Sequence, residues 1–130
     1  MQRINFASGA HWEELIGYSR AVKIGNLVEV TGTVAVDENN QIVGKDSPYE
    51  QAKYILFKIE KVLERAGATL KNVVRTRIYV TDISRWEEFG KAHREVFKDI
   101  KPCTTLVEVT ALISPEYLIE IEATAILHTL

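Results

Sequence analysis

Two glutamates, Glu120 and Glu122, stand two positions apart in the closing stretch of the chain, residues 118–127. Apolar and polar residues alternate there as in a β-strand, so both carboxylates share one face of that strand. A carboxylate held beside a bound molecule can orient a water and accept its proton during hydrolysis. The same side chains can instead pair with Arg75 and Arg77, which alternate in the same way earlier in the chain. Both interpretations of Glu120 stay open, whereas Glu122 is expected to be structural.

The remaining reactive side chains do not form a recognisable catalytic or metal-binding motif. The three histidines lack the spacing of metal ligands, and His93 falls on the apolar face of a predicted helix, where a satisfied core or interface residue is expected. The single cysteine, Cys103, has no partner for an internal disulfide and is interpreted as a small apolar side chain. Gly32 does not belong to a glycine-rich phosphate loop. We therefore expect no metal and no cofactor.

Length and charge exclude several classes of protein. The chain has 130 residues, 46% of them hydrophobic, so we expect one domain over residues 1–130. Its 16 basic and 18 acidic residues give a formal net charge of −2, which argues against a nucleic-acid partner. No apolar run has the length of a signal peptide or a membrane span, so we expect no membrane association and a cytoplasmic location.

Two helices are predicted from their start signals and their apolar spacing. Ser47, Pro48 and Glu50 combine an N-cap serine, a proline at the first helical position and a glutamate at the third. Apolar residues then recur at helical spacing up to Gly67, which is expected to end the helix. Ser84 precedes a similar signature, and its side chain is predicted to cap a second amphipathic helix.

Strands are predicted where β-rich composition or alternation replaces helical spacing. These stretches are residues 20–32 with a hairpin turn at Gly25-Asn26, then 72–80, 104–109 and 118–127. In the second of them, Val74 is expected on the apolar face together with Thr76, Ile78 and Val80. Two amphipathic helices can cover one face of a sheet of five or six strands. The predicted fold class is therefore α+β, a two-layer sandwich with one mixed sheet and both helices on the same face.

The second face of this sheet is expected to be open in a single chain. It would present charged and aromatic groups, namely Arg75, Arg77, Tyr79, Glu108, Glu120 and Glu122, among Leu106, Leu118 and Ile126. A lone monomer would leave these apolar groups in water. A partner subunit that covers the sheet explains such a surface better than solvent does.

Short motifs along the chain also follow a family order. They are Tyr18-Ser19-Arg20-Ala21-Val22-Lys23 with Gly25-Asn26 and Thr31-Gly32, Val80-Thr81-Asp82, the Pro102 segment with Val107-Glu108-Val109, and Ile119-Glu120-Ile121-Glu122-Ala123. They resemble the Rid/YjgF family, the reactive-intermediate deaminases, over nearly the whole chain. The resemblance implies a chorismate-mutase-like fold, a homotrimer around a threefold axis and three small-molecule clefts at the subunit interfaces.

The resemblance also implies which residues line each cleft. In active members, an arginine just after the proline binds the carboxylate of an amino-acid-derived enamine or imine, and a glutamate on the last strand positions the hydrolytic water. Glu120 matches this glutamate, and Tyr18 and Thr31 match a pocket tyrosine and a small hydroxyl residue. Thr104 occupies the arginine position and Thr105 follows it, so their hydroxyls are the groups expected to hold a substrate.

The missing arginine bears directly on activity. Arginine offers a carboxylate two charge-assisted hydrogen bonds, whereas threonine offers one neutral donor. Candidates to replace it are Arg20, Arg75, Arg77 and Lys101, none of which stands at the matching position. Gly90 also replaces a helix residue that is often asparagine in active members.

Two functions of different classes remain open. One is hydrolytic deamination of an enamine or imine, with Glu120 orienting water. The other is a trimer whose clefts bind a small metabolite or contact another protein without catalysis, which fits the missing arginine better. A third function attached to some relatives, as endoribonuclease or translation inhibitor, is disfavoured because the chain is slightly acidic and lacks a paired acid and base.

Overall fold

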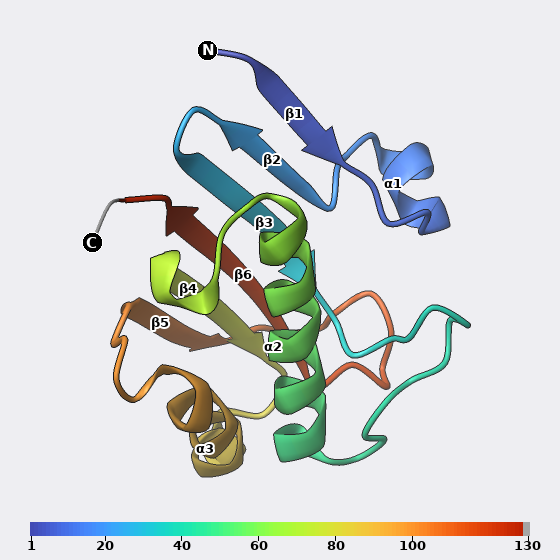
Figure 1. Cartoon of the computed structure of the whole chain (residues 1–130). Coiled ribbons are helices and arrows are strands. Elements are labelled where there is room, and N and C mark those ends of the chain that lie inside the picture. The colour runs from blue at the N-terminus through green and yellow to red at the C-terminus, as the bar shows by residue number, and fades with distance from the viewer. Residues whose placement is uncertain (129–130) are drawn as a thin grey trace.

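The computed structural model describes residues 1–128 and contains one six-stranded sheet (Figure 1). Its strands are β1 (Arg3–Phe6), β2 (Ala21–Ile24), β3 (Leu27–Thr33), β4 (Val73–Val80), β5 (Cys103–Glu108) and β6 (Ile119–Ile126). Their spatial order is β1-β2-β3-β6-β4-β5, and every pair is antiparallel except β4 with β5. The sheet is therefore mixed, as predicted, although β1 was not among the predicted strands.

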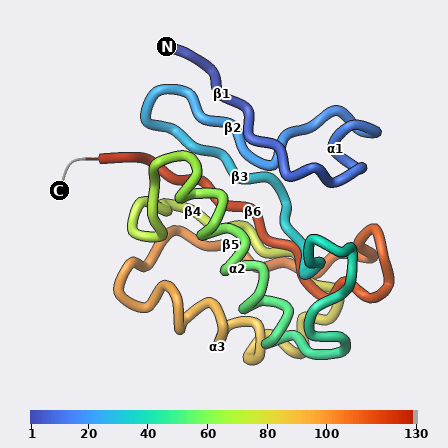
Figure 2. The backbone as a smooth tube through the Cα atoms, turned by 45° about the vertical axis from the view of Figure 1, so that its right-hand side comes forward, coloured from blue at the N-terminus to red at the C-terminus, as the bar shows by residue number. Residues whose placement is uncertain are grey.

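Two long helices, α2 (Pro48–Arg65) and α3 (Trp86–Phe97), cover one face of the sheet, and they contact each other (Figures 1 and 2). A short helix, α1 (His11–Ile16), precedes β2, and 3₁₀ turns at Leu70–Asn72 and Ile83–Arg85 precede β4 and α3. The buried apolar core lies between the helices and the sheet. This arrangement confirms the predicted α+β class. None of the helices described here is both long and apolar enough to cross a bilayer.

The start of α2 follows the predicted cap. The hydroxyl oxygen of Ser47 accepts a hydrogen bond from the backbone N–H of Glu50 at 3.2 Å, and Pro48 opens the helix. The backbone N–H of Ser47 donates to the carbonyl of Gly44 at 2.9 Å. After the helix, Gly67 adopts a φ of 81°, a conformation that favours glycine.

We expect Ser47→Ala to lower the free energy of unfolding by about 0.5–2 kcal/mol, because the first turn of α2 loses its side-chain acceptor. Urea unfolding followed by circular dichroism measures this difference. Ser84→Ala is the matched control and should change stability by less than about 0.5 kcal/mol. Equal stability of the Ser47→Ala variant and the wild type would contradict the role of this cap.

The predicted cap of the second helix is wrong. Ser84 does not cap α3, which begins at Trp86 without a side-chain cap. Instead Asp82 caps the preceding 3₁₀ turn, where its carboxylate accepts the backbone N–H of Ser84 at 3.0 Å and the hydroxyl at 2.6 Å. Aspartate competes well for such turn positions because its short carboxylate reaches the backbone two residues on.

Val74 does not lie on the apolar face of β4 and is 38% exposed. The pairing of β4 with β6 shifts register between Val73 and Arg75, which marks a β-bulge. Val73, only 3% exposed, takes the buried place, and alternation resumes at Thr76. A bulge of this kind interrupts the period of two on which the prediction relied.

Two residues predicted on the open face, Leu106 and Glu108, lie on the helix side. β5 runs parallel to β4 with Ile78 beside Leu106 and Val80 beside Glu108, and both β4 residues are buried under the helices. A carboxylate oxygen of Glu108 accepts a backbone N–H from the turn before α3 at 2.9 Å. Leu118, which directly precedes β6, is partly buried against the core. Alternation in an isolated strand shows that two faces differ, but not which of them meets the helices.

Candidate active site on the open sheet face

Glu120 lies half-buried on the face of β6 that α2 and α3 leave open, directly opposite Tyr79 in the antiparallel pairing. Burial and the neighbouring Glu122 carboxylate raise the pKa of Glu120, while the positive charge of Arg20 partly offsets this rise. A carboxyl group with a raised pKa is better matched to accepting and returning protons than an exposed glutamate is.

A bulge in β3 makes room for this carboxylate. The pairing of β3 with β6 shifts register between Val30 and Thr33, so Thr31 and Gly32 stand opposite a single residue of β6, Glu122. Gly32 lies against the side chain of Glu120, two residues earlier on β6. A Cβ atom added to Gly32 would lie 2.9 Å from Cδ of Glu120 and closer still to Oε2. Because Gly32 does not have a positive φ, this glycine is required for space rather than for backbone geometry.

Arg20 lies at the same bulge. Its Nη2 donates to the backbone oxygen of Gly32 at 3.3 Å, and its Nε is buried without an acceptor within residues 1–128. Burial lowers the pKa of Arg20, while Tyr18, Glu13 and Glu120 favour the charged form. None of the ion pairs found among the described residues includes Arg20. The cation thus lies close to the Glu120 carboxylate without forming an ion pair with it.

A second cation, Lys58 of α2, reaches this end of the sheet. Its Nζ donates to the backbone oxygens of Val34 at 2.9 Å and Val36 at 2.8 Å. Burial and the charge of Arg20 lower the pKa of Lys58 to about 8, against the opposing influence of Asp37. Two of the three ammonium donors are therefore engaged in holding the segment that follows β3.

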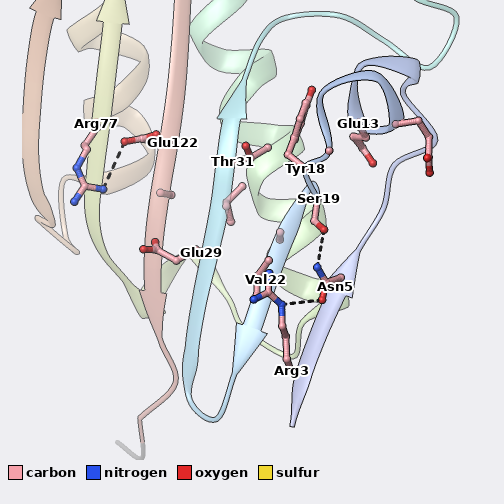
Figure 3. A pocket seen from close by; sticks show the side chains of 15 residues that line it. Arg3, Asn5, Glu13, Tyr18, Ser19, Val22, Glu29, Thr31, Arg77 and Glu122 are labelled. Carbon is pink, nitrogen blue, oxygen red and sulfur yellow. Dashed lines mark hydrogen bonds and ion pairs between the residues drawn. The ribbon is translucent and has the colours of Figure 1, made fainter. Parts of the chain in front are cut away.

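Glu122 has structural partners. Its Oε1 lies 3.6 Å from Nη1 of Arg77 (Figure 3). The same oxygen accepts a hydrogen bond from the Tyr79 hydroxyl at 3.0 Å. This arrangement agrees with the ion-pair interpretation of Glu122. It also explains why Glu122 influences Glu120 only as a neighbouring negative charge.

A cavity of about 630 Å³ opens on the same face beside α1 (Figure 3). Tyr18 and Thr31 line it together with Glu13, whereas Glu120 and Arg20 are not among its lining residues. Glu13 is 7% exposed, and its carboxylate accepts the backbone N–H of Ser8 at 3.1 Å as well as the Ser8 hydroxyl. A lone glutamate in a six-residue helix carries no sequence signal, so sequence analysis missed it.

The two predicted threonines are not near Glu120 in one chain. Thr104 lies on the helix-covered face, where its hydroxyl is 2.8 Å from that of Thr76, which is 2.9 Å from Nε2 of His93. Burial lowers the pKa of His93 and favours its neutral form. Thr105 lies on the opposite face and accepts a hydrogen bond from Nη1 of Arg75 at 3.3 Å. Within a single chain, Tyr18 and Thr31 share a cavity on the open face, and Glu120 lies on that face outside the lining of this cavity. Neither Thr104 nor Thr105 lies beside Glu120.

The candidate replacement cations occupy four different places. Arg20 is beside Glu120, Arg75 binds Thr105, Arg77 pairs with Glu122, and Lys101 lines a second cavity of about 320 Å³ next to Pro102. Only Arg20 is close enough to influence the pKa of Glu120. In the part of the chain that the structure describes, no three His, Cys, Asp or Glu side chains cluster as metal ligands do.

The structure is a small two-layer α+β fold, with both long helices on one face of a mixed sheet. Comparisons with known proteins identify its family. The family model described as Endoribonuclease L-PSP matches residues 10–127. The crystal structure of Rv2704 from Mycobacterium tuberculosis, a member of the YjgF/YER057c/UK114 family, superimposes with a TM-score of 0.88 at 50% identity, covering 97% of this chain and 100% of that one. The chain therefore belongs to the Endoribonuclease L-PSP family, which is the YjgF/RidA family, and the predicted resemblance is confirmed.

Two relatives extend the comparison. An uncharacterised protein of Streptomyces coelicolor is 34% identical over 118 residues, 91% of this chain and 87% of its own length. A protein of Acinetobacter baylyi named 3-aminoacrylate deaminase RutC is 32% identical over 111 residues, 85% of this chain and 87% of its own.

Proposed function

We propose that this chain forms a homotrimer whose inter-subunit clefts bind a small enamine or imine that carries a carboxylate, and that it hydrolyses this compound with Glu120 positioning the water. The observation that carries the proposal is the half-buried Glu120 carboxyl, seated over Gly32 on a sheet face that α2 and α3 leave open. Similarity to a relative named as a 3-aminoacrylate deaminase supports the reaction class, since 3-aminoacrylate is itself a small enamine acid.

The proposed reaction needs only water and a group that accepts and returns a proton. Glu120 accepts a proton from water as the water oxygen bonds to the imine carbon, and the C=N π electrons move to nitrogen, which takes up a proton. The carbinolamine then collapses: its nitrogen takes up a second proton, from the Glu120 carboxyl, the C–N bond breaks to release ammonia, and the hydroxyl returns its proton to the Glu120 carboxylate as the carbonyl forms. An enamine enters this sequence after protonation on carbon.

The placement of Thr104 supports a cleft made from two subunits. Within one chain, Thr104 and Glu120 lie on opposite faces of the sheet, so no single chain can present both to one small molecule. β5 is an edge strand, which leaves Thr104 and Thr105 near the rim of the subunit. A second copy approaching that edge with its own Glu120 would complete the set of predicted residues.

A trimer that binds a small metabolite or another protein without catalysis is the second candidate. The residue at position 104 favours this candidate. Active relatives carry an arginine there, whereas Thr104 is uncharged and its hydroxyl is hydrogen-bonded to that of Thr76. The endoribonuclease activity suggested by the family's descriptive name gains no support from a net charge of −2.

One preparation of the wild type tests this proposal in two measurements. Light scattering coupled to size exclusion should give about three times the chain mass of 14.7 kDa. The same sample should accelerate loss of the imino acid formed by dehydration of serine, followed by trapping the remaining imine with semicarbazide. A monomer would contradict the inter-subunit cleft, and imine loss no faster than in buffer would favour the non-catalytic trimer.

A further inference from the structure

The guanidinium of Arg20 has donors that the chain itself does not use. A guanidinium carries five N–H donors and remains charged at neutral pH. Among the described residues, the guanidinium of Arg20 makes one hydrogen bond, to the backbone oxygen of Gly32 at 3.3 Å, and its Nε lacks an acceptor. Charge-assisted bonds are usually shorter, and a buried charged donor without a partner is costly. Because Nε is buried, an arriving anion would bond to the Nη1 and Nη2 groups, of which only Nη2 has a partner among the described residues.

The other cations near the open face are already engaged. Lys58 donates to two backbone oxygens, Arg77 pairs with Glu122, and Arg75 binds Thr105. Lys101 lines the second cavity and does not lie beside Glu120. Of the candidates for an anion-binding group, Arg20 alone combines unused donors with a position next to the proposed water-positioning carboxylate.

The chemistry of an α-imino acid requires this closeness. Its imine carbon is bonded directly to the carboxylate carbon, so the group that anchors the carboxylate must lie near the group that positions water. A ligand carboxylate close to Glu120 would meet like-charge repulsion, which a cation between the two carboxylates reduces. Arg20 occupies the bulge that seats Glu120 and satisfies both requirements.

We propose that Arg20 binds the carboxylate of the ligand in the cleft, taking over the role that arginine plays at the Thr104 position in active relatives. The nature of the ligand rests on the proposed function, whereas the anion-binding role of Arg20 does not. Arg20 is thus the residue that makes the cleft select carboxylates over their uncharged analogues.

The test compares a carboxylate with its uncharged counterpart. Pyruvate, the product of hydrolysing the imino acid of serine, and methyl pyruvate, its ester, are titrated into the trimer by calorimetry. Arg20→Gln should weaken pyruvate binding about ten- to hundredfold and leave methyl pyruvate unchanged. Arg20→Lys keeps the positive charge but cannot form two parallel hydrogen bonds to a carboxylate, so its pyruvate affinity should lie between those of the wild type and Arg20→Gln. It also carries the test if Arg20→Gln fails to assemble.

The matched control is Arg65→Gln, since Arg65 lies at the end of α2 and donates to the backbone oxygen of Ala7. It should bind pyruvate as the wild type does. Arg75→Gln tests the rival anchor. A loss of pyruvate binding in Arg75→Gln, with none in Arg20→Gln, would assign the anchor to the Thr105 side of the cleft and overturn the proposal.

Kinetics separate this proposal from the deaminase proposal. In Arg20→Gln, KM should rise about ten- to hundredfold, and the acid limb of the pH profile should move to higher pH, because removing the cation raises the pKa of Glu120 further. If pyruvate binding depends on Arg20 but the protein does not hydrolyse the imine, the deaminase proposal is wrong and the proposal that Arg20 binds the carboxylate stands. Turnover with an unchanged KM in Arg20→Gln would overturn the anchor alone. A wild type that neither binds pyruvate nor turns over would overturn both.

Discussion

Glu120→Gln is expected to lower kcat for imine hydrolysis about 10²- to 10⁴-fold, the range typical of losing a general base. The amide keeps the size of the side chain and can still hydrogen-bond a water, but it cannot accept the proton that the water must lose. KM should change little, because the proposed carboxylate anchor is a different residue. Semicarbazide trapping of the imine, at substrate concentrations above and below KM, separates the two constants.

Glu122→Gln is the matched control, on the same strand and the same face two residues away. It should retain most of the rate, and its pH profile should report on Glu120. Glu122 raises the pKa of Glu120, so its neutralisation lowers that pKa and moves the acid limb of the profile to lower pH. Equal rates for Glu120→Gln and the wild type, with an intact trimer, would refute the role assigned to Glu120.

Much of the fold could be predicted because its signals are local. The serine and proline before α2 and the alternation in β6 act over a few residues, and the structure agrees with both. The misses arise where tertiary pairing decides. The bulge at Val73 and Val74 depends on how β4 meets β6, and the placement of Leu106 depends on which face of β5 meets the helices. No pattern within a single strand contains that information.

The candidate site divides in the same way. Sequence motifs single out a carboxylate, a tyrosine and a small hydroxyl residue. In the structure, Tyr18 and Thr31 line a cavity on the sheet face that also carries Glu120. The need for a glycine at position 32 follows from a bulge and a side-chain position that only three-dimensional structure shows. The resemblance implied an inter-subunit cleft holding Thr104 with Glu120, and the sheet register shows only that the two residues lie apart within a single chain.

The second large effect is expected from Gly32→Ala, which should lower kcat about a hundredfold. A displacement of about 1 Å of a catalytic group, here the Glu120 carboxylate, typically has an effect of this size. The added methyl group would occupy the space of the Glu120 carboxylate. That carboxylate is the movable end of a side chain and the backbone at Gly32 has no positive φ, so the side chain should shift while the fold persists. Thermal unfolding and light scattering check that the variant remains folded and assembled.

The double variant Gly32→Ala with Glu120→Gln decides whether the glycine acts through the carboxylate. If Gly32 serves only to seat Glu120, the double variant should be no slower than Glu120→Gln alone, because the group displaced by the methyl is already disabled. If the two reductions in kcat multiply in the double variant, the bulge contributes to the reaction by another route.

Gly90→Ala is the control for the general effect of adding a methyl group, since the new Cβ would lie 3.9 Å from the Trp86 ring, an ordinary contact. In a helix, Gly90→Ala should stabilise the fold by roughly 0.5–1 kcal/mol and leave kcat unchanged. A Gly32→Ala variant that is stable but slow would then owe its low kcat to the displaced Glu120 carboxylate.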